Sequence, residues 1–247
     1  MNLSDAESRP ALVLSCEHAG NRVPGPWRPL FEGADEVLAS HRGWDPGALA
    51  LARRMARTLD APLIAVSVTR LLVDANRSPG HPRLFSPFTR GLPPGERERL
   101  LARHYRPHHA RVEAAVRDGL GRTGRVLHVG VHSFTPVLNG RLRRLDVGLL
   151  YDPSRELERS LAAAWLAAAR GALPELRFRA NAPYRGTSDG LTTLLRRRFP
   201  PERYSGVELE IGQGLLEAGA RVPGEVARGL EASLRELVAA PPERATP

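Results

Sequence analysis

The residues best suited to chemistry are two histidines and a carboxylate that lie beside predicted strand ends. His18 follows one short apolar run, His132 follows another, and Asp45 closes the segment His41-Arg-Gly-Trp-Asp45 at the start of a predicted helix. Ligands in open α/β sheets bind beyond the carboxyl ends of the strands, so these three side chains could converge on one divalent metal. Catalytic zinc sites commonly take three protein ligands of this kind and keep the fourth position for water.

Glu210 supplies a further carboxylate at the far end of a late predicted strand. A carboxylate that is not a ligand could accept a proton from water and deliver it to a leaving nitrogen. Glu208 and Glu210 face the same side of their strand, opposite Val207, Leu209 and Ile211. Two interpretations are open: a solvated strand face, or carboxylates buried in a sheet covered on both faces, where they need partners.

Each candidate also has an ordinary structural explanation. A histidine after a strand is commonly a hydrogen-bonded turn residue. Asp45 is well placed as the N-cap of a helix whose first residue is Pro46. Glu17 or Glu208 could replace Asp45 as the third ligand. The pattern therefore indicates a metal site and leaves its third ligand open.

Two polar turns carry arginines that could hold an acidic substrate. Asn76 and Arg77 lie in the turn Asp74-Ala-Asn-Arg77-Ser-Pro, and Arg185 lies at the centre of the loop of residues 181–190. Arginine is suited to bidentate capture of a carboxylate, so the two turns could clamp such a substrate. The alternative is that both are structural turns with solvent-exposed arginines.

Other polar residues point less directly to chemistry. His104, His108 and His109 share one predicted helix, where we expect exposure to solvent, and we expect His128 in the core or beside the site. Cys16 could share a strand face with His18, but the chain has no G-x-S-x-G, P-loop or Rossmann glycine pattern. Thiol catalysis is therefore a minor alternative.

Alternating strands and helices predict a single α/β domain over residues 1–247, three layers deep, with a mostly parallel, mixed central sheet. We expect its core to span about residues 11–239, with flexible ends at 1–10 and 241–247. The predicted strands are residues 11–16, 62–68, 125–131, 145–151, 176–179 and 205–211, and the predicted helices are residues 46–59, 95–118, 154–171, 189–198 and 224–238.

The composition narrows the functional classes. The net charge of +9 comes entirely from arginine, because the chain has no lysine. The arginines are dispersed, and no aromatic residues alternate with the basic runs, so nucleic-acid binding is disfavoured. One cysteine excludes an intramolecular disulfide and a cysteine-based zinc cluster. With no apolar run of membrane-spanning length and no signal-peptide pattern, we expect a cytoplasmic protein without a membrane partner.

Six short motifs occur in order along approximately residues 11–216. They are Ser15-Cys-Glu-His-Ala-Gly-Asn-Arg-Val-Pro24, His41-Arg-Gly-Trp-Asp45, Val73-Asp-Ala-Asn-Arg77, Val131-His-Ser-Phe134, Asn181-Ala-Pro-Tyr-Arg-Gly186 and Val207-Glu-Leu-Glu-Ile211. Together they resemble the N-formylglutamate amidohydrolase family. The resemblance implies a zinc-dependent hydrolase with an α/β fold related to the zinc carboxypeptidases and the phosphorylase/hydrolase-like folds. It also implies cleavage of the amide of an acidic N-acyl amino acid, typically N-formyl-L-glutamate.

Carried over by position, the resemblance implies a ligand set of His18, Asp45 and His132. It implies that Glu210 is the general base and that Arg77 and Arg185 occupy cationic positions of the family. The chain has Glu-His-Ala-Gly-Asn where the histidine-degradation enzymes have a Pro-His-Ser-Gly-like turn, and Thr187-Ser188-Asp189 where their loop runs on differently. It therefore resembles a broader branch of the family.

We thus expect a metal-dependent amidohydrolase with one zinc, or another divalent ion, per chain. Arg77, Arg185 and Asn76 are the expected substrate-binding residues, and His41 and Ser133 are expected to orient ligands or substrate. The alternatives are a catalytically inactive module that binds an acidic metabolite on the same scaffold, and a nucleic-acid-binding protein. Metal content separates the first alternative from the enzyme, and the salt dependence of DNA binding tests the second. The oligomeric state is left open.

Overall fold

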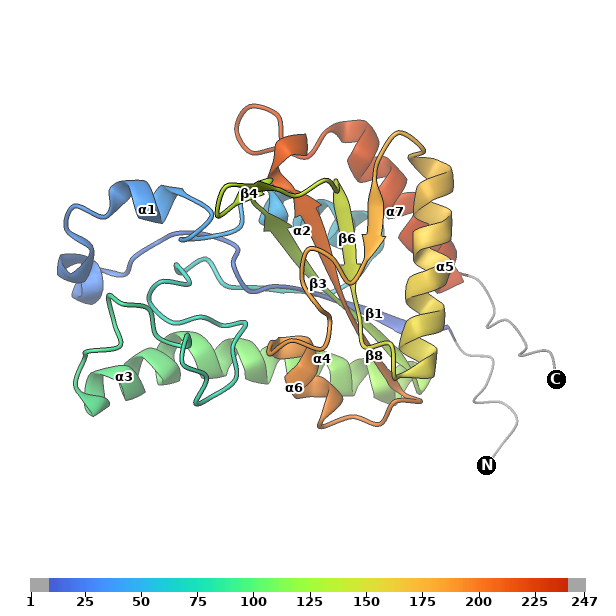
Figure 1. Ribbon diagram of the computed structural model, residues 1–247. Coiled ribbons are helices and arrows are strands. Elements are labelled where there is room, and N and C mark those ends of the chain that lie inside the picture. The colour runs from blue at the N-terminus through green and yellow to red at the C-terminus, as the bar shows by residue number, and fades with distance from the viewer. Residues whose placement is uncertain (1–8, 240–247) are drawn as a thin grey trace.

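A six-stranded sheet forms the centre of the computed structural model, which describes residues 9–239 (Figure 1). The strand order is β2-β1-β3-β8-β6-β7, and every neighbouring pair is parallel except β6 with β8. The predicted α/β fold with a mostly parallel, mixed sheet is therefore confirmed. The strands are β1 (Ala11–Cys16), β2 (Leu63–Ala65), β3 (Val126–Phe134), β6 (Val147–Leu150), β7 (Phe178–Ala180) and β8 (Tyr204–Gly212); β4 (Val137–Leu138) and β5 (Arg141–Leu142) form a separate hairpin.

Helices cover both faces of the sheet. One face packs its apolar side chains against α2 (Ala48–Thr58), α5 (Glu156–Ala172) and α7 (Gly224–Ala239). The other packs against α4 (Arg106–Thr123) and α6 (Leu191–Arg196). The three predicted layers follow from this arrangement, because alternate strand residues point to opposite helical layers. No helix among residues 9–239 is long and apolar enough to cross a membrane. The predicted flexible ends lie largely outside the described residues.

A smaller apolar cluster extends the molecule beyond the carboxyl ends of β1 and β3. It is built around Trp27, Phe31 and Leu72, and in Figure 1 its helices project away from the sheet. The short helices involved are η2 (Gly25–Phe31), α1 (Asp35–Ala39) and α3 (Pro94–Leu100); η4 (Gln213–Leu215) follows β8.

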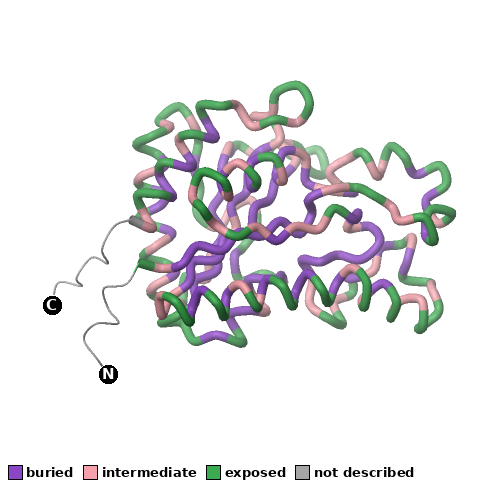
Figure 2. The backbone as a smooth tube through the Cα atoms, turned by 180° about the vertical axis from the view of Figure 1, so that it is seen from behind, coloured by how far each residue is buried: buried purple, intermediate pink, exposed green. Residues whose placement is uncertain are grey.

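The irregular segment of residues 71–76 is buried throughout, as the purple loops outside the sheet in Figure 2 illustrate. Buried backbone polar groups need partners. The N–H of Asp74 donates to Leu84 O at 2.9 Å, and the N–H of Leu72 donates to Thr69 O at 3.0 Å. This network gives an irregular segment the fixed position that a functional loop requires.

Three local predictions are corrected. The third strand ends at Phe134, so His132 and Ser133 lie within β3 instead of following it. The predicted helix from Pro46 begins at Ala48, and its N-cap is Gly47 with φ of 83°, so Asp45 is not a helix cap. The predicted helix at residues 95–118 is two α-helical segments joined by a π-helical turn, η3 (Leu101–Tyr105).

Candidate active site

Three side chains meet near the carboxyl ends of β1 and β3. His18 lies in the turn after β1, Asp45 precedes α2, and His132 is part of β3. The Nδ1 atoms of His18 and His132 are 3.2 Å and 3.0 Å from the same Asp45 oxygen, Oδ2. One donor atom from each residue lies within 4.8 Å of the others, and all three residues are buried. The structure thus brings together the three expected ligands.

The protonation of this cluster favours a cation at its centre. A neutral imidazole has a single N–H, so its second nitrogen is an acceptor. His18 Nε2 lies 2.8 Å from Asp74 Oδ1, and His132 Nε2 lies 3.0 Å from Glu17 Oε2. If these nitrogens carry the protons, two Nδ1 lone pairs and the Asp45 carboxylate face one another, and only positive charge between them relieves the repulsion. Neutral imidazole and ionised carboxylate are also the forms that bind metals, so this donor set fits a divalent ion such as zinc.

In the protein without a metal, a proton on His132 supplies positive charge between these groups. Burial alone would lower the pKa of His132, but its contacts with Asp45 and Glu17 raise that pKa well above the ordinary value. Burial alone would raise the pKa of Asp45, but His18 and His132 hold it below its usual range. The cluster is therefore a set of mutually stabilised charges.

Glu17 and Asp74 fix the far side of each imidazole. Glu17 is 2% exposed and lies between two histidines, with Oε1 3.1 Å from His108 Nε2 and Oε2 3.0 Å from His132 Nε2. Burial alone would raise the pKa of Glu17, but these two histidines hold it well below its usual value. Carboxylates in this position set the tautomer and orientation of metal-binding histidines.

Arg70 connects two of the carboxylates. Its Nη2 donates to Asp74 Oδ2 at 2.9 Å, and its Nη1 lies 3.5 Å from Asp45 Oδ1. Burial would raise the pKa of Asp74, but Arg70 and His18 keep it well below its usual value. Arg70 therefore stabilises the ionised form of Asp74 and links the side chains of Asp74 and Asp45.

Glu210 lies on β8, directly beside His132 in the register of β3 and β8. Its side chain is buried, and its Oε2 has no hydrogen-bond partner among the described residues. Burial raises its pKa to about 8; Asp45 and Glu208 also raise it, whereas His132 and Arg70 oppose the shift. Of the two interpretations of this strand face, burial holds for Glu210, whereas Glu208 is half-buried and accepts a bond from Thr192 at 3.2 Å.

Ser133 links β3 to the loop that carries Asp45. Its hydroxyl donates to Pro46 O at 2.7 Å and accepts a bond from Gln213 at 3.1 Å. Its backbone N–H lies 3.4 Å from Asp45 Oδ2. These contacts connect Ser133 to Asp45 and to the residue that follows it.

The two arginine-bearing turns are bonded to each other. The N–H of Leu191 donates to Asn76 Oδ1 at 2.7 Å, and Arg77 Nη1 donates to Asp189 O at 2.8 Å. The N–H of Ser78 donates to Asp189 Oδ2 at 3.0 Å. The polar atoms of Asn76 and Arg77 are thus partly committed within the protein, whereas Arg185 is exposed.

Two expectations about histidines have different outcomes. The expectation that His108 and His109 are exposed is wrong, because they are 4% and 9% exposed; His108 contacts Glu17 and His109 bonds Ala75 O at 2.9 Å. His128 is fully buried between Ser15 and Tyr204, at 2.8 Å from each hydroxyl, as expected of a core residue. His41 lies near the site and is half-buried.

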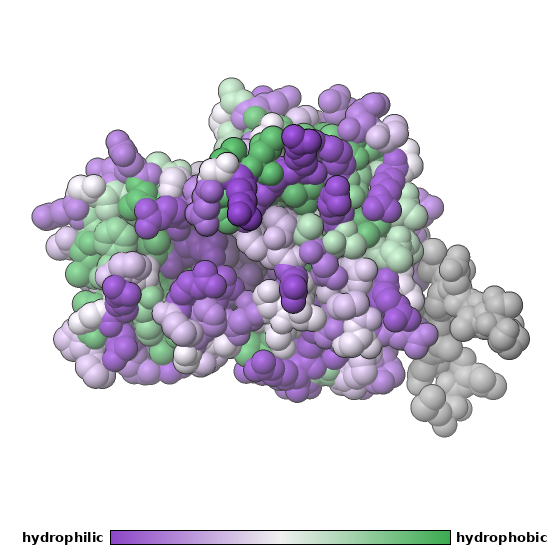
Figure 3. All heavy atoms as spheres, in the orientation of Figure 1, coloured by the Kyte–Doolittle hydropathy of each residue, from purple (hydrophilic) through white to green (hydrophobic). Residues whose placement is uncertain are grey.

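A hydrophilic hollow opens at the centre of the face in Figure 3, between the projecting helices and the rest of the molecule.

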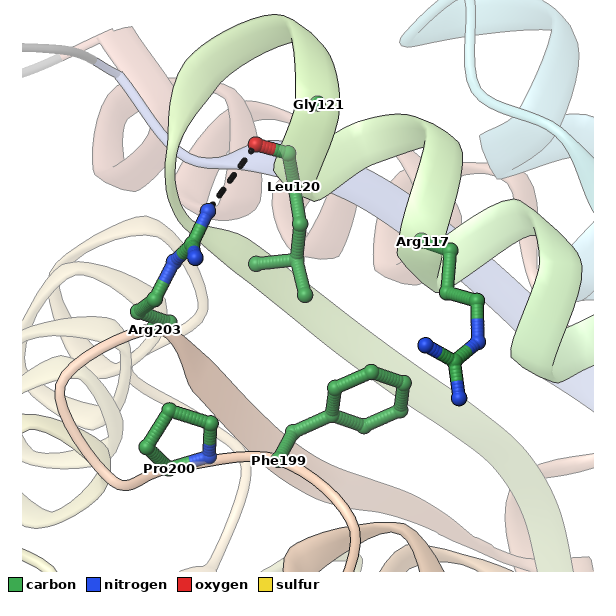
Figure 4. Close-up of a pocket in the computed structure, with 6 residues that line it drawn as sticks. All are labelled: Arg117, Leu120, Gly121, Phe199, Pro200 and Arg203. Atoms are coloured by element: carbon green, nitrogen blue, oxygen red, sulfur yellow. Dashed lines mark hydrogen bonds between the residues drawn. The ribbon is translucent and has the colours of Figure 1, made fainter.

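A separate cavity, of about 310 Å³, lies between α4 and residues 199–203 (Figure 4). There Arg203 donates to Gly124 O and Leu120 O, and Arg117 lies over the Phe199 ring. This cavity adjoins the start of β8, whereas Glu210 lies near its end, and neither carboxylate nor histidine lines it.

Comparison with known proteins shows the family and the fold of the chain. The family model of N-formylglutamate amidohydrolases matches residues 10–216. The crystal structure of a gene product from Agrobacterium tumefaciens is 36% identical, with a TM-score of 0.75 over 94% of this chain and 90% of that one. An N-formylglutamate amidohydrolase from Ralstonia eutropha is 24% identical, with a TM-score of 0.62 over 94% of this chain and 92% of that one. No curated protein matches the chain.

The fold and the polar cluster define an α/β protein with its candidate active site at the carboxyl ends of parallel strands. Because the family model covers most of its length, the chain belongs to the N-formylglutamate amidohydrolase family. Membership of this family identifies it as a hydrolase of the amidohydrolase class.

Proposed function

We propose that the chain is a metal-dependent amidohydrolase that cleaves the amide of a small N-formyl or N-acyl acidic amino acid, such as N-formyl-L-glutamate. The observation that carries the proposal is the convergence of two histidine Nδ1 atoms on one oxygen of Asp45. The family match supports the substrate class. The proposal includes a cytoplasmic site of action on a free small molecule.

In this proposal His18, Asp45 and His132 hold one divalent ion, for which zinc is the expected identity. Such an ion, when bound, lowers the pKa of water and polarises a carbonyl group. Glu17 and Asp74 keep the two imidazoles in the tautomer that leaves Nδ1 free as a ligand, because each carboxylate faces an Nε2 atom.

Glu210 is the proposed proton carrier. Its Oε2 accepts a proton from the water that attacks the acyl carbon and then delivers that proton to the departing amine nitrogen. A group whose pKa lies near the working pH can do both, and burial moves the pKa of Glu210 to about 8. Its register position beside His132 places it on the same sheet face as the ligands.

Arg77, Arg185 and Asn76 are the proposed substrate-binding residues, and they contribute in different ways. Arg77 and Asn76 shape the wall of the site through their bonds to residues 189–191. Arg185 is exposed in the loop that crosses β6, where Gly148 allows close approach: a Cβ there would lie 2.0 Å from Ala182 O. His41 and Ser133 are proposed to orient the ligands or the substrate.

The test is turnover of a panel of N-formyl and N-acetyl amino acids by the purified protein, followed as release of free amine. We expect acidic members to be the best substrates and activity to be lost on chelation and restored by zinc. Ligand-site variants His18→Ala and His132→Ala should be inactive, while Arg228→Ala on α7 serves as a matched control. Absence of hydrolysis of every member by the zinc-loaded protein would contradict the enzymatic proposal, and absence of bound metal as well would favour the metabolite-binding module.

A further inference from the structure

Arg143 is an arginine close to the candidate site whose guanidinium lacks an acidic partner. It follows the β4–β5 hairpin, and its backbone N–H donates to Pro136 O at 2.8 Å. Its Nη1 donates to the Tyr184 hydroxyl at 3.1 Å and lies 3.4 Å from Thr135 O. Within residues 9–239, no carboxylate lies within ion-pair distance of this guanidinium.

Two aromatic rings hold the guanidinium in position. The Arg143 Cζ atom lies 4.9 Å from the centre of the Tyr184 ring and 5.8 Å from that of Phe134. Arg143 is half-buried and Phe134 is buried. An arginine fixed on aromatic faces loses less conformational freedom when it binds a carboxylate, and partial removal from water strengthens the resulting charged hydrogen bonds.

The chain places Arg143 at the edge of the site. Phe134 and Thr135, which it contacts, directly continue the strand segment that carries His132. In Figure 3 the surface at the β4–β5 hairpin borders the hydrophilic hollow. The pKa of His41 supports this placement: burial lowers it, and the charges of Arg42, Arg143 and Arg70 lower it further.

The other arginines around the site are less suited to a substrate carboxylate. Arg70 is paired with Asp74 and Asp45, and Arg77 donates to backbone carbonyls. Arg185 is exposed, so its side chain has the most freedom to lose on binding. Arg143 combines a fixed position with unused capacity for an anion.

We propose that Arg143 binds a carboxylate of the substrate and is the main determinant of selectivity for acidic N-acyl amino acids. This inference rests on the proposed function, because it takes the substrate to be an N-acyl amino acid. It adds Arg143 to the proposed substrate-binding residues and gives Arg143 a larger share of carboxylate binding than Arg185. Tyr184 acts as a positioning residue through its hydroxyl and its ring.

The test measures binding apart from turnover. In a Glu210→Gln background, calorimetry gives the Kd of N-formyl-L-glutamate, of N-formyl-L-glutamine and of N-formyl-L-isoglutamine, in which one or the other carboxylate is an amide. We expect Arg143→Met to weaken binding of N-formyl-L-glutamate about tenfold to a hundredfold. The loss should vanish for the analogue that lacks the carboxylate held by Arg143. Arg143→Lys should retain part of the affinity, and Tyr184→Phe should lose a few-fold.

Arg144→Met is the matched control, because Arg144 is the exposed neighbour in the same loop, and Arg185→Met tests the competing residue. Equal losses for all three ligands in Arg143→Met, or a larger effect from Arg185→Met, would overturn the inference. Wild-type turnover of N-formyl-L-glutamate with an unchanged Kd in Arg143→Met would overturn this inference alone. Failure of the Glu210→Gln parent to bind N-formyl-L-glutamate would overturn both the inference and the proposed substrate.

Discussion

His132 and Glu210 occupy register-matched positions on β3 and β8, two parallel strands in hydrogen-bond contact. Matched positions on neighbouring strands project to the same sheet face. An imidazole that faces Asp45 and a buried carboxyl of raised pKa therefore stand side by side on that face. This pairing allows one residue to serve as a ligand while its neighbour carries protons.

Glu210→Gln separates proton transfer from metal binding. The substitution keeps the shape of the side chain but removes its ability to accept a proton, so we expect kcat to fall about 10²- to 10⁴-fold. Metal content and thermal midpoint should be retained. Glu208→Gln, two residues earlier on the same face, is the control and should retain most activity. Comparable losses in the two variants would argue against the role given to Glu210.

Glu17→Gln and His108→Asn test the contacts behind His132. Glu17 bridges the two imidazoles, so we expect either change to weaken zinc affinity about 10- to 100-fold. Competition with a chromophoric chelator measures this affinity directly. His104→Asn is the control on the same helical stretch, because His104 contacts Trp27 and not the site. Unchanged zinc affinity in both Glu17→Gln and His108→Asn would show that these contacts serve only packing.

His128 should make stability depend on acidity. Burial lowers its pKa from 6.5 to about 4 in the folded protein. Between these values the unfolded chain binds more protons, so the free energy of unfolding falls as the pH decreases from 6.5 towards 4, by on the order of 3 kcal/mol for this residue. The destabilisation caused by His128→Gln should therefore be smaller at pH 4.5 than at pH 7. Denaturant unfolding of both proteins at each pH gives the difference in their free energies of unfolding, in which the contributions of the other titrating groups cancel. An equal difference at pH 4.5 and pH 7 would contradict the lowered pKa of His128.

Glu158 and Arg196 form a buried ion pair that supports the loop of residues 181–190. Arg196 Nη2 lies 2.7 Å from Glu158 Oε1, and the N–H of Gly206 donates to Glu158 Oε2 at 3.0 Å. Removing one partner leaves an uncompensated buried charge, so Glu158→Gln should cost about 3–5 kcal/mol. The exposed pair of Arg177 and Asp146 is the control, since Asp146→Asn should cost no more than about 1 kcal/mol. Urea unfolding distinguishes the two, and similar costs would contradict this account of Glu158.

Much of the site could be predicted because parallel strands share one edge. His18, His132 and Glu210 each lie near the end of an apolar run, and the alternation of Val207, Leu209 and Ile211 places Glu210 on the opposite face. This periodicity can be recognised in the local sequence without information on contacts between distant segments. The strand order and the single antiparallel neighbour, by contrast, depend on pairing between segments far apart in sequence.

The features that the sequence did not predict lie where the helical or strand periodicity is interrupted. A π-helical turn inserts an extra residue just before α4 and so changes which face His108 and His109 present, which a single helical period does not anticipate. Arg70 is half-buried in the irregular chain just before residues 71–76, and its position is set by bonds such as Arg70 N–H to Gly43 O at 3.1 Å. The mutual docking of Arg77 and Asp189 joins loops 112 residues apart, and local turn chemistry carries no signal for that contact.

Elemental analysis of the purified protein beside a His18→Ala/His132→Ala double variant tests the proposed metal site most directly. We expect about one zinc per wild-type chain and none in the folded double variant. Absence of bound metal in the wild type, even after incubation with zinc and dialysis, would contradict the proposed metal site.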